Sequence, residues 1–585
     1  MVYGAGAASL ANIATGDNNI DSLIANNRWH STDITFSFTN NFWNDYEDES
    51  GYADSQTHSI SFSRLNSAQQ TIARNWMAMY ANVSGLTLTE LTGGRDRNAV
   101  IRIAESNSPR TAYAYGPGTS VQAGDVWFNR VDYNEPVVGN FAYYTIGHEI
   151  GHALGLEHGH EANGIRGVAM DADRDSMEFS IMTYRSYEGA PTDFVYNETW
   201  GYPQSLMMYD IAAIQAMYGA NFDYNATDTF YRFSPTTGEM FVNDVGQGTP
   251  GDNRIFRTVW DGSGIDTYDF LNYTTDLNIN LAPGQWSDLN VDGNAQRAHL
   301  GDGNYARGHL FNALQYKGDS RSFIENAYGG TGDDQLHGNA AGNFLWGNAG
   351  NDRLYGYESN DHLYGSAGND WIDGGYGLDV MNGGEGIDTL DTRFWNDSYE
   401  LDMRTGVTNF VGETALNFEN VYTGAGDDYI IGTATRNYIH TGGGNDRLIG
   451  GGGNDVLIGG DGNDVLDASG LSNPNEVDYL LGGGGADNFV LQNNGSVYQG
   501  LSLIFDFNVL EGDTISLPGS GPSAFVNRFD FQDGFFGGLS GSYLVNTTAS
   551  NPGGQVAFFR YNAAGGIGNE AALDTLFSGE SAPIV

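Results

Sequence analysis

Cysteine is absent from the 585 residues of this chain, and basic residues are scarce. Without cysteine, neither disulfides nor thiolate ligands can hold the fold, so any metal must bind histidine, carboxylate, carbonyl or phenol groups. Lys+Arg number 25 against 73 Asp+Glu, and the resulting net charge of -48 argues against nucleic acid as a partner. No apolar run approaches the length of a membrane span, and the start lacks the basic region of a signal peptide. We therefore expect neither a membrane span nor an N-terminal secretion signal.

The length of the chain predicts several domains, because single domains usually hold about 100 to 200 residues. Residues 1–245 alternate strand and helix patterns, which predicts an α+β or α/β domain. Strands are expected at 34–38, 99–105 and 125–129, and helices at 66–85, 140–154 and 205–219. Residues 246–327 are patterned as strands and form a predicted β-rich connector.

Glycine is abundant, with 83 residues, and it is concentrated where the sequence repeats every nine residues. The first block covers 328–391, a β linker follows at 392–421, the second block covers 422–490, and 491–585 is a β-rich C-terminal region. One position of the repeat is almost always aspartate, and an apolar residue stands two positions later. The aspartates at this position are Asp334, Asp352, Asp361, Asp370, Asp379, Asp388, Asp428, Asp446, Asp455, Asp464 and Asp487, with Asn343 and Asn437 as exceptions.

These repeats predict a parallel β-roll that binds calcium. Glycine permits tight turns, aspartate supplies oxygen ligands for Ca²⁺, and the apolar residue points inward from a short strand. If two repeats form one turn of the roll, aspartates eighteen residues apart stack, so Asp352 with Asp370 and Asp361 with Asp379 would each bracket a calcium ion. The alternative is a disordered linker, but a linker has no reason to keep an apolar residue at the same position of every nine-residue unit.

Residues 148–158 read HEIGHALGLEH and predict a catalytic zinc site. On a helix, His148 and His152 lie on one face and can reach the same ion, and Glu149 is placed to act as a general base. Gly155 ends the helix, so the chain can turn and bring His158 to the ion as a third ligand. One coordination position then stays open for water. The alternative is a histidine-rich helix packed in a core.

The spacing HExxHxxGxxH, followed by Met182 in SIMTY, resembles the metzincin metalloproteases, and most of the chain is similar to their serralysin branch. This resemblance implies that Tyr184 is a further zinc ligand that also stabilises the intermediate. It implies that AYAYGPG (112–118) is the cleft-edge strand that pairs with an extended peptide. It also implies a very short propeptide, because Trp29 and His30 lie near the start of the mature enzyme. Where the family has Pro-Gly after the third histidine, this chain has Gly159 and His160, and we expect His160 on the surface.

The same resemblance implies calcium sites at the domain junction, with Asp261, Asp266, Glu325, Gly330, Gly332 and Asp334 as ligands, and a further carbonyl site at Asn225, Thr227 and Thr229. The nine-residue units resemble the RTX repeats of proteins that Gram-negative bacteria secrete. That similarity implies export by type I secretion machinery, a C-terminal signal and folding in external calcium.

Together these features predict a secreted, zinc-dependent and calcium-stabilised endopeptidase that acts on proteins or peptides as a monomer. Its expected fold is a multidomain one: an α+β (α/β) metzincin domain, a parallel β-roll and a β-rich C-terminal region. Two alternatives are a calcium-binding adhesin with an inactive protease-like domain, and a zinc hydrolase with a non-peptide substrate. The intact Glu149 argues against the adhesin, since a scaffold does not need it.

Overall fold

The computed structural model describes residues 8–42, 46, 55–193, 195–468, 476–491, 501–508 and 510–516, and the backbone of strands at 529–536, 539–546 and 554–559. The chain divides into two compact units, Met1–Ala341 and Gly342–Val585. The fold class predicted from the sequence, a multidomain chain with a parallel β-roll, is confirmed. The domain boundaries expected within 1–327 stay predictions, as do those within 328–585. The expected C-terminal secretion signal lies outside the described residues.

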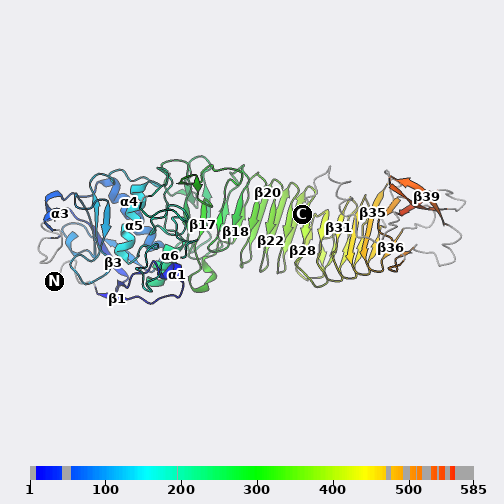
Figure 1. Ribbon diagram of the computed structural model, residues 1–585, viewed down its shortest axis with the longest axis horizontal. Coiled ribbons are helices and arrows are strands. Elements are labelled where there is room, and N and C mark those ends of the chain that lie inside the picture. The colour runs from blue at the N-terminus through cyan, green and yellow to red at the C-terminus, as the bar shows by residue number, and fades with distance from the viewer. Residues whose placement is uncertain are drawn as a thin grey trace. The chain divides into compact units, whose positions relative to one another are not determined.

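The first unit contains a five-stranded sheet of order β4-β3-β5-β7-β6 (Figure 1). Its strands are β3 (Asp33–Phe38), β4 (Thr87–Glu90), β5 (Ile101–Ser106), β6 (Ala112–Ala114) and β7 (Asp125–Asn129). The strands pair in parallel, except that β6 runs antiparallel to β7 at the edge. The helices are α1 (Asn18–Asp21), α3 (Ser55–Ser61), α4 (Ser67–Val83), α5 (Phe141–Leu154) and α6 (Met208–Tyr218). The three expected strands and the three expected helices are therefore present, whereas α1 and α3 carry no clear sequence pattern.

Helix α4 is capped at its N-terminus by Asn66. The side chain of Asn66 accepts from Gln69 N at 3.0 Å, and the Gln69 side chain accepts from Asn66 N at 2.7 Å, which is a capping box. Its buried face packs on α5 through Trp76, whose indole donates to Tyr143 O at 2.9 Å. A Cβ atom on Gly147 would lie 2.5 Å from the Trp76 ring, so the two helices approach closely only because α5 has a glycine there.

The rest of the first unit consists of short strands. They are β1 (Ser9–Ala11), β2 (Asn27–Trp29), β8 (Phe230–Phe233), β9 (Met240–Val242), β10 (Val245–Gly246), β11 (Arg257–Val259), β12 (Thr267–Asp269), β13 (Asn278–Asn280), β14 (Trp286–Ser287), β15 (His299–Gly301), β16 (Asn304–Tyr305), β17 (Leu310–Asn312), β18 (Asn326–Tyr328) and β19 (Gln335–His337). Phe256, Trp260, Leu300 and Phe311 from this region belong to the same buried cluster as the residues of α4 and α5. The predicted connector is therefore packed into the core of the helical region.

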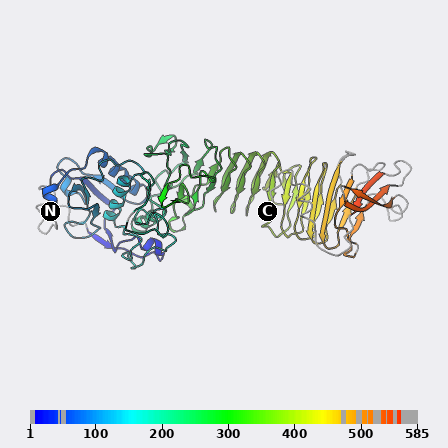
Figure 2. The same cartoon turned by 45° about the horizontal axis from the view of Figure 1, so that its top comes forward.

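The second unit is built from two mostly parallel sheets whose strands alternate along the chain (Figure 2). One sheet contains β20 (Phe344–Ala349), β22 (His362–Ala367), β24 (Val380–Glu385), β28 (Thr414–Leu416), β27 (Val407–Thr408), β26 (Glu400–Asp402), β30 (Tyr429–Ile431), β32 (Arg447–Ile449), β34 (Val465–Asp467), β36 (Asn488–Val490) and β38 (Thr514–Ser516). The other contains β21 (Arg353–Tyr355), β23 (Trp371–Asp373), β25 (Thr389–Asp391), β29 (Asn420–Tyr422), β31 (Tyr438–His440), β33 (Val456–Asp461), β35 (Val477–Gly484), β37 (Leu501–Ile504), β41 (Gly554–Phe559), β40 (Leu539–Asn546) and β39 (Phe529–Phe536).

Neighbouring strands pair with a register of eighteen residues through most of both repeat blocks, as two repeats per turn require, and the register is twenty-three residues where β33 pairs with β35 and β34 pairs with β36. Leu345 pairs with Leu363 in one sheet, and Leu354 pairs with Ile372 in the other. Each of these apolar side chains is fully buried, so the core of the roll consists of one residue per repeat. The linker between the blocks continues the roll, because β24 pairs with β28 and β26 pairs with β30, with β27 between them as an antiparallel strand. Within the described residues, no helix is long and apolar enough to cross a membrane.

Candidate metal centre

Helix α5 and the turn after it bring three imidazoles together. His148 and His152 lie one helical turn apart, and α5 ends at Leu154 because Gly155 takes a left-handed conformation with φ of 108°. His158 then returns to the helix, so that its Nε2 atom lies 3.3 Å from His148 Nε2 and 2.9 Å from His152 Nε2. The Nε2 atoms of His148 and His152 are 3.1 Å apart. The sequence prediction that these three histidines meet is confirmed.

The arrangement of the rings fits a zinc ion. The Nδ1 atom of His148 donates to Ile181 O at 2.7 Å, and that of His152 donates to Leu156 O at 2.8 Å, so the Nε2 lone pairs point at one another. Burial lowers the pKa of His148 well below its ordinary value and that of His152 to about 3, which keeps both rings neutral. Three converging lone pairs repel unless a cation lies between them. A tetrahedral zinc with bonds of about 2.1 Å separates its nitrogens by about 3.4 Å, close to the observed spacing.

Glu149 lies beside this cluster and is buried. Its Oε2 atom has no hydrogen-bond partner among the described residues, and burial raises its pKa to about 8. A buried carboxylate with no donor is unfavourable unless a cation or a bound molecule satisfies it. A cation beside the carboxylate also lowers its pKa again, which returns it to the ionised form near neutral pH. The environment of Glu149 therefore favours a metal ion in the neighbouring cluster.

Asp210, a buried aspartate that the sequence analysis did not single out, supports the histidine cluster indirectly, through the turn at Ile181. Asp210 accepts hydrogen bonds from Ser180 Oγ at 2.6 Å, Ile181 N at 2.8 Å and Met207 N at 2.9 Å. It thereby fixes the turn whose Ile181 carbonyl orients the His148 ring. An acidic residue in the first turn of an otherwise apolar helix was the available signal for this role.

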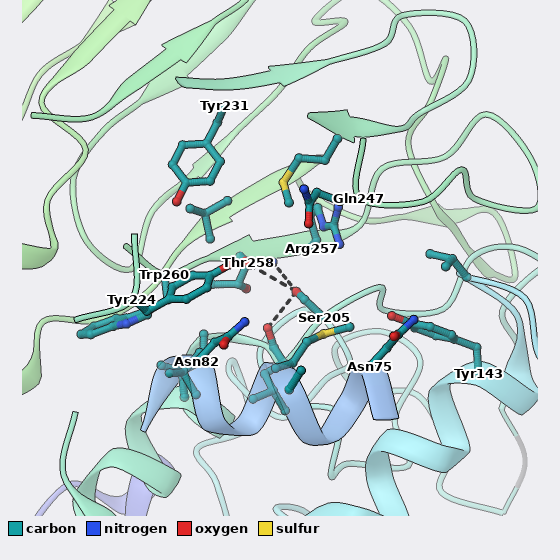
Figure 3. A pocket seen from close by; sticks show the side chains of 18 of the residues that line it. Asn75, Asn82, Tyr143, Ser205, Tyr224, Tyr231, Gln247, Arg257, Thr258 and Trp260 are labelled. Carbon is teal, nitrogen blue, oxygen red and sulfur yellow. Dashed lines mark hydrogen bonds between the residues drawn. The ribbon is translucent and has the colours of Figure 1, made fainter. Parts of the chain in front are cut away.

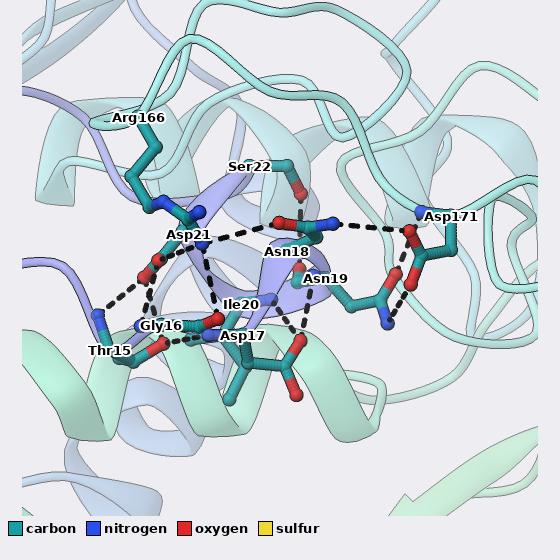
Figure 4. Close-up of polar contacts among 10 residues, drawn as sticks. All are labelled: Thr15, Gly16, Asp17, Asn18, Asn19, Ile20, Asp21, Ser22, Arg166 and Asp171. Carbon is teal, nitrogen blue, oxygen red and sulfur yellow. Dashed lines mark hydrogen bonds and ion pairs between the residues drawn. The ribbon is translucent and has the colours of Figure 1, made fainter.

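The N-terminal segment holds the turn between His152 and His158. Ala25 N donates to Gly155 O, and Glu157 N donates to Leu23 O, both at 2.9 Å. Figure 4 shows how helix α1 is tied to the loop beyond His158: Asp171 N donates to Asn19 Oδ1 at 2.8 Å, and Arg166 forms an ion pair with Asp21 at 3.4 Å. The sequence expectation of a very short propeptide stays a prediction.

Tyr184 and His160 both pack against the third histidine. The Tyr184 ring centroid lies 4.5 Å from that of His158 and 5.9 Å from that of His148, and the tyrosine is 37% exposed. The ring of His160 lies 4.7 Å from Tyr184 and 5.3 Å from His158. The expectation that His160 is a surface residue is wrong, since its side chain is only 8% exposed. The contact between the rings of Tyr184 and His160 could not be predicted from the sequence pattern.

The expected cleft-edge strand lies next to the metal-binding helix. β6 forms the edge of its sheet, and a Cβ atom on Gly116, just beyond it, would lie 3.6 Å from His152 O. One side of β6 therefore has no strand partner in the described sheet. The residues that follow β6 approach the helix that carries His152.

The predicted junction ligands form a buried acidic cluster in the first unit. Asp266 accepts from Thr229 N at 2.8 Å, and its own amide donates to Glu325 Oε2 at 2.8 Å. Burial and then repulsion from Asp261 raise the pKa of Asp266. The Oδ2 atom of Asp266 is buried without a partner among the described residues. In the same unit, Asp334 accepts from Gly330 N at 2.6 Å and from Leu277 N at 2.9 Å.

The repeat aspartates of the second unit form two ladders of buried carboxylates. In most steps, the amide of one aspartate donates to Oδ1 of the aspartate eighteen residues later, as in Asp361 to Asp379 at 2.9 Å. Other steps of eighteen residues are Asp352 to Asp370, Asp370 to Asp388, Asp428 to Asp446 and Asp446 to Asp464. The step from Asp464 to Asp487 spans twenty-three residues. The Oδ2 atoms of Asp361, Asp388, Asp446, Asp455 and Asp464 are buried with no hydrogen-bond partner among the described residues.

Two further aspartates extend these ladders beyond the repeats found in the sequence. Asp455 N donates to Asp478 Oδ1, and Asp487 N donates to Asp513 Oδ1, both at 3.0 Å. Both aspartates carry an apolar residue two positions later, Leu480 and Ile515, which is the spacing of the repeat. The insertions before them hid the nine-residue period, but the Asp-x-apolar spacing was the signal that could have found them.

Family models match parts of the chain that agree with this structure. The RTX calcium-binding nonapeptide repeat matches four times, at 328–362, 355–390, 422–457 and 440–470. The model named Peptidase M10 serralysin C terminal matches residues 220–301. These matches confirm that the repeats predicted from the sequence are of a calcium-binding type.

Curated relatives show the same similarity. The metallopeptidase AprA of Pseudomonas marginalis is 33% identical over 297 residues, which cover 49% of this chain and 57% of the relative. Serralysin B of Dickeya chrysanthemi is 31% identical over 323 residues (52% and 58%), and the serralysin of Photorhabdus laumondii is 32% identical over 298 residues (49% and 56%). The chain thus spans a little over half the length of these relatives. The chain is therefore similar to serralysin-type metalloproteases over about half of its length, and it contains matches to the RTX calcium-binding repeat.

Proposed function

We propose that this protein is a secreted, zinc-dependent endopeptidase that hydrolyses proteins or peptides and is stabilised by calcium. The observation that carries the proposal is the convergence of three Nε2 atoms within 3.3 Å of one another, next to a buried Glu149 whose Oε2 atom has no partner among the described residues. His148, His152 and His158 would hold the zinc ion. When bound, zinc lowers the pKa of a water molecule to about 7 and polarises the scissile carbonyl.

The chain supplies the remaining parts of a peptide-bond hydrolysis. Glu149 accepts the proton of the attacking water at Oε2 and passes it to the leaving amine. The Tyr184 phenol donates to the oxyanion that develops on the carbonyl, and between turnovers it serves as a further ligand. The edge strand β6 pairs with the substrate backbone as an added antiparallel strand, which tolerates many side chains.

The calcium ligands of the proposal are the residues of the junction cluster and the ladders: Asp261, Asp266, Glu325, Gly330, Gly332 and Asp334 in the first unit, and the repeat aspartates in the second. Asp261, Asp266 and the repeat aspartates are buried, and calcium prefers carboxylate and carbonyl oxygen ligands. Export by a type I machinery, an extracellular location and a monomeric state complete the proposal, with the RTX repeats as support.

Hydrolysis of casein by the full chain in calcium tests the proposal. We expect Glu149→Gln to retain zinc, measured by metal analysis, and to lose roughly a hundredfold or more of the rate, because a positioned general base contributes that much. Glu135→Gln, a change at an exposed glutamate, serves as the matched control and should cleave at the parent rate.

Removal of zinc by a chelator should abolish cleavage in the parent protein. Cleavage by Glu149→Gln at the parent rate would refute the assigned base. A folded, zinc-loaded parent that cleaves neither casein nor other unfolded proteins would instead favour the adhesin or the non-peptide hydrolase.

A further inference from the structure

A cavity of ≈ 340 Å³ lies in the first unit between helix α4 and the strands β8 to β11, formed by residues that no step of the proposed hydrolysis uses (Figure 3). Asn75, Met79 and Asn82 line it from α4, and Arg257, Thr258 and Val259 line it from β11. Tyr143 contributes from the first turn of α5, away from the histidines in its later turns. The cavity is therefore a site separate from the metal centre.

Arg257 is a buried cation without a partner. It is 8% exposed, and its side chain makes no ion pair or hydrogen bond with any described residue. Burial lowers the pKa of its guanidinium, as expected when no anion compensates the charge. Arg102 shows how the same unit satisfies a buried arginine: its guanidinium pairs with Asp125 at 2.7 Å. Arg257 has no such carboxylate, so an anion from outside the chain would supply the missing partner.

The surroundings of Arg257 specify the charge of that anion. The lining contains no other basic residue and no acidic one, so a single positive charge is available. A monoanion is balanced by one arginine, whereas a phosphate dianion would leave a negative charge in a partly buried site. The net charge of -48 on the protein opposes a polyanion further.

The other residues that line the cavity indicate the chemical nature of the uncharged part of the ligand. Gln247 lies beside Arg257 in Figure 3, so one amide group is close to the guanidinium, and Asn75 contributes a second amide to the lining. Beyond them the lining is mainly apolar or aromatic: Met79, Val83, Val138, Leu206, Ile211, Tyr224, Val259 and Trp260. Pockets that combine an apolar wall with one charged group bind small organic molecules by burying their hydrocarbon part and orienting their polar part.

We propose that this cavity binds a small organic monocarboxylate, with the carboxylate paired to Arg257 and the hydrocarbon part against Val83, Leu206 and Trp260. A planar carboxylate matches the two parallel N–H groups of a guanidinium. The ligand bridges β11 and α4, and α4 is the helix on which α5 packs. Its binding therefore stabilises the folded first unit in proportion to the ligand concentration.

Titration calorimetry of the full chain in calcium, with octanoate as the probe, tests this site. We expect saturable binding of one octanoate per chain, and a rise in the unfolding temperature of the first unit. Arg257→Met should weaken the affinity roughly ten- to a hundredfold, the usual contribution of a hydrogen-bonded charge. Arg64→Met, at an exposed arginine outside the cavity, is the matched control and should leave the affinity unchanged.

A second variant and two further probes complete the test. Ala78→Trp, at an exposed position on the rim, should obstruct the cavity and weaken binding without a change in the core. Octan-1-ol, which lacks the charge, and inorganic phosphate, which lacks the hydrocarbon part, should each bind at least about tenfold more weakly than octanoate. The proposal is overturned if octanoate does not bind, if Arg257→Met and Ala78→Trp both keep the parent affinity, or if octanol or phosphate binds as tightly as octanoate.

Discussion

Met182 packs directly against Gly151, the residue that precedes His152 on helix α5. A Cβ atom on Gly151 would lie 2.9 Å from Met182 Sδ and 2.6 Å from the Tyr80 hydroxyl. The missing side chain lets the methionine and the tyrosine support the helical turn that carries His148 and His152. The glycine within the histidine motif is therefore a packing requirement of the site.

Gly151→Ala is expected to destabilise the first unit by about 1–3 kcal/mol, because the added methyl group overpacks a core that cannot shift freely. Thermal unfolding and zinc content measure the effect, and both should fall. Gly118→Ala is the control, since its Cβ would lie at ordinary contact distances of 3.8 Å from Ala123 Cβ and 4.0 Å from Gly116 O. Parent-like stability and zinc content in Gly151→Ala would show that the contact with Met182 does not matter.

Tyr184→Phe keeps the ring beside His158 and removes only the hydroxyl group. If that hydroxyl stabilises the developing oxyanion, kcat should fall by roughly a hundredfold while KM changes little. Steady-state kinetics on a peptide substrate measure both constants. Tyr305→Phe, an exposed tyrosine in β16, provides the comparison. An unchanged kcat in Tyr184→Phe would remove Tyr184 from the proposed chemistry.

Asp361→Asn retains the size of the side chain and its bond to Asn343 N, but removes one negative charge from the ladder. We expect the calcium affinity of the second unit to fall by about tenfold, or ~1.4 kcal/mol, because a charged oxygen ligand is lost. Calcium titration followed by circular dichroism measures this change. Asp397→Asn, at an exposed aspartate of the linker, should have no effect; equal losses in both variants would contradict a specific role for Asp361.

Gly368→Ala should prevent proper stacking of the first repeat block. Gly368 has a φ of 138°, and a Cβ atom there would lie 1.7 Å from Gly350 O on the preceding turn. A backbone atom cannot move aside cheaply, so the calcium concentration needed for folding should rise several-fold. Gly452→Ala is the matched control, because its Cβ would lie 3.4 Å from Ala434 O. Folding of Gly368→Ala at the parent calcium concentration would contradict the close stacking.

Without calcium, the second unit should be more stable in mild acid than in base. Burial raises the pKa of Asp361 and Asp455 to about 8 and that of Asp464 to about 7, from an ordinary value of 3.8. The folded unit therefore binds protons more tightly than the unfolded chain. The contribution of these aspartates to the free energy of unfolding is complete below about pH 4 and is lost as the pH rises through about 8.

Circular dichroism with a calcium chelator should accordingly show more β-structure at pH 5 than at pH 8. Added calcium should reduce the difference, because the ion neutralises the carboxylates in place of protons. Greater loss of structure at pH 5 than at pH 8, with the chelator present, would contradict the assignment of these groups as the dominant buried charges.

Local patterns in the sequence were sufficient for the repeating parts of this protein. The Asp-x-apolar spacing and the glycines determined the eighteen-residue register of the roll, because each strand pairs with a copy of itself. The cap at Asn66 and the end of α5 at Gly155 were likewise predictable, since each depends on the backbone within a few residues. The meeting of His148, His152 and His158 followed from their spacing along one helix and one turn.

The tertiary structure alone decided which distant segments complete the sites. Asp210 supports the turn at Ile181, Leu23 and Ala25 pair with the turn before His158, and His160 is buried beneath Tyr184. Arg257 of β11 lines a cavity that residues of α4 also line and that has no acidic residue among its lining residues. Contacts between residues far apart in the chain leave no periodic signal, because the free energy that selects them comes from the packing of the whole core. The sequence by itself therefore determined the histidine motif and the repeat, and the folded chain decided which distant residues support them and where the separate cavity lies.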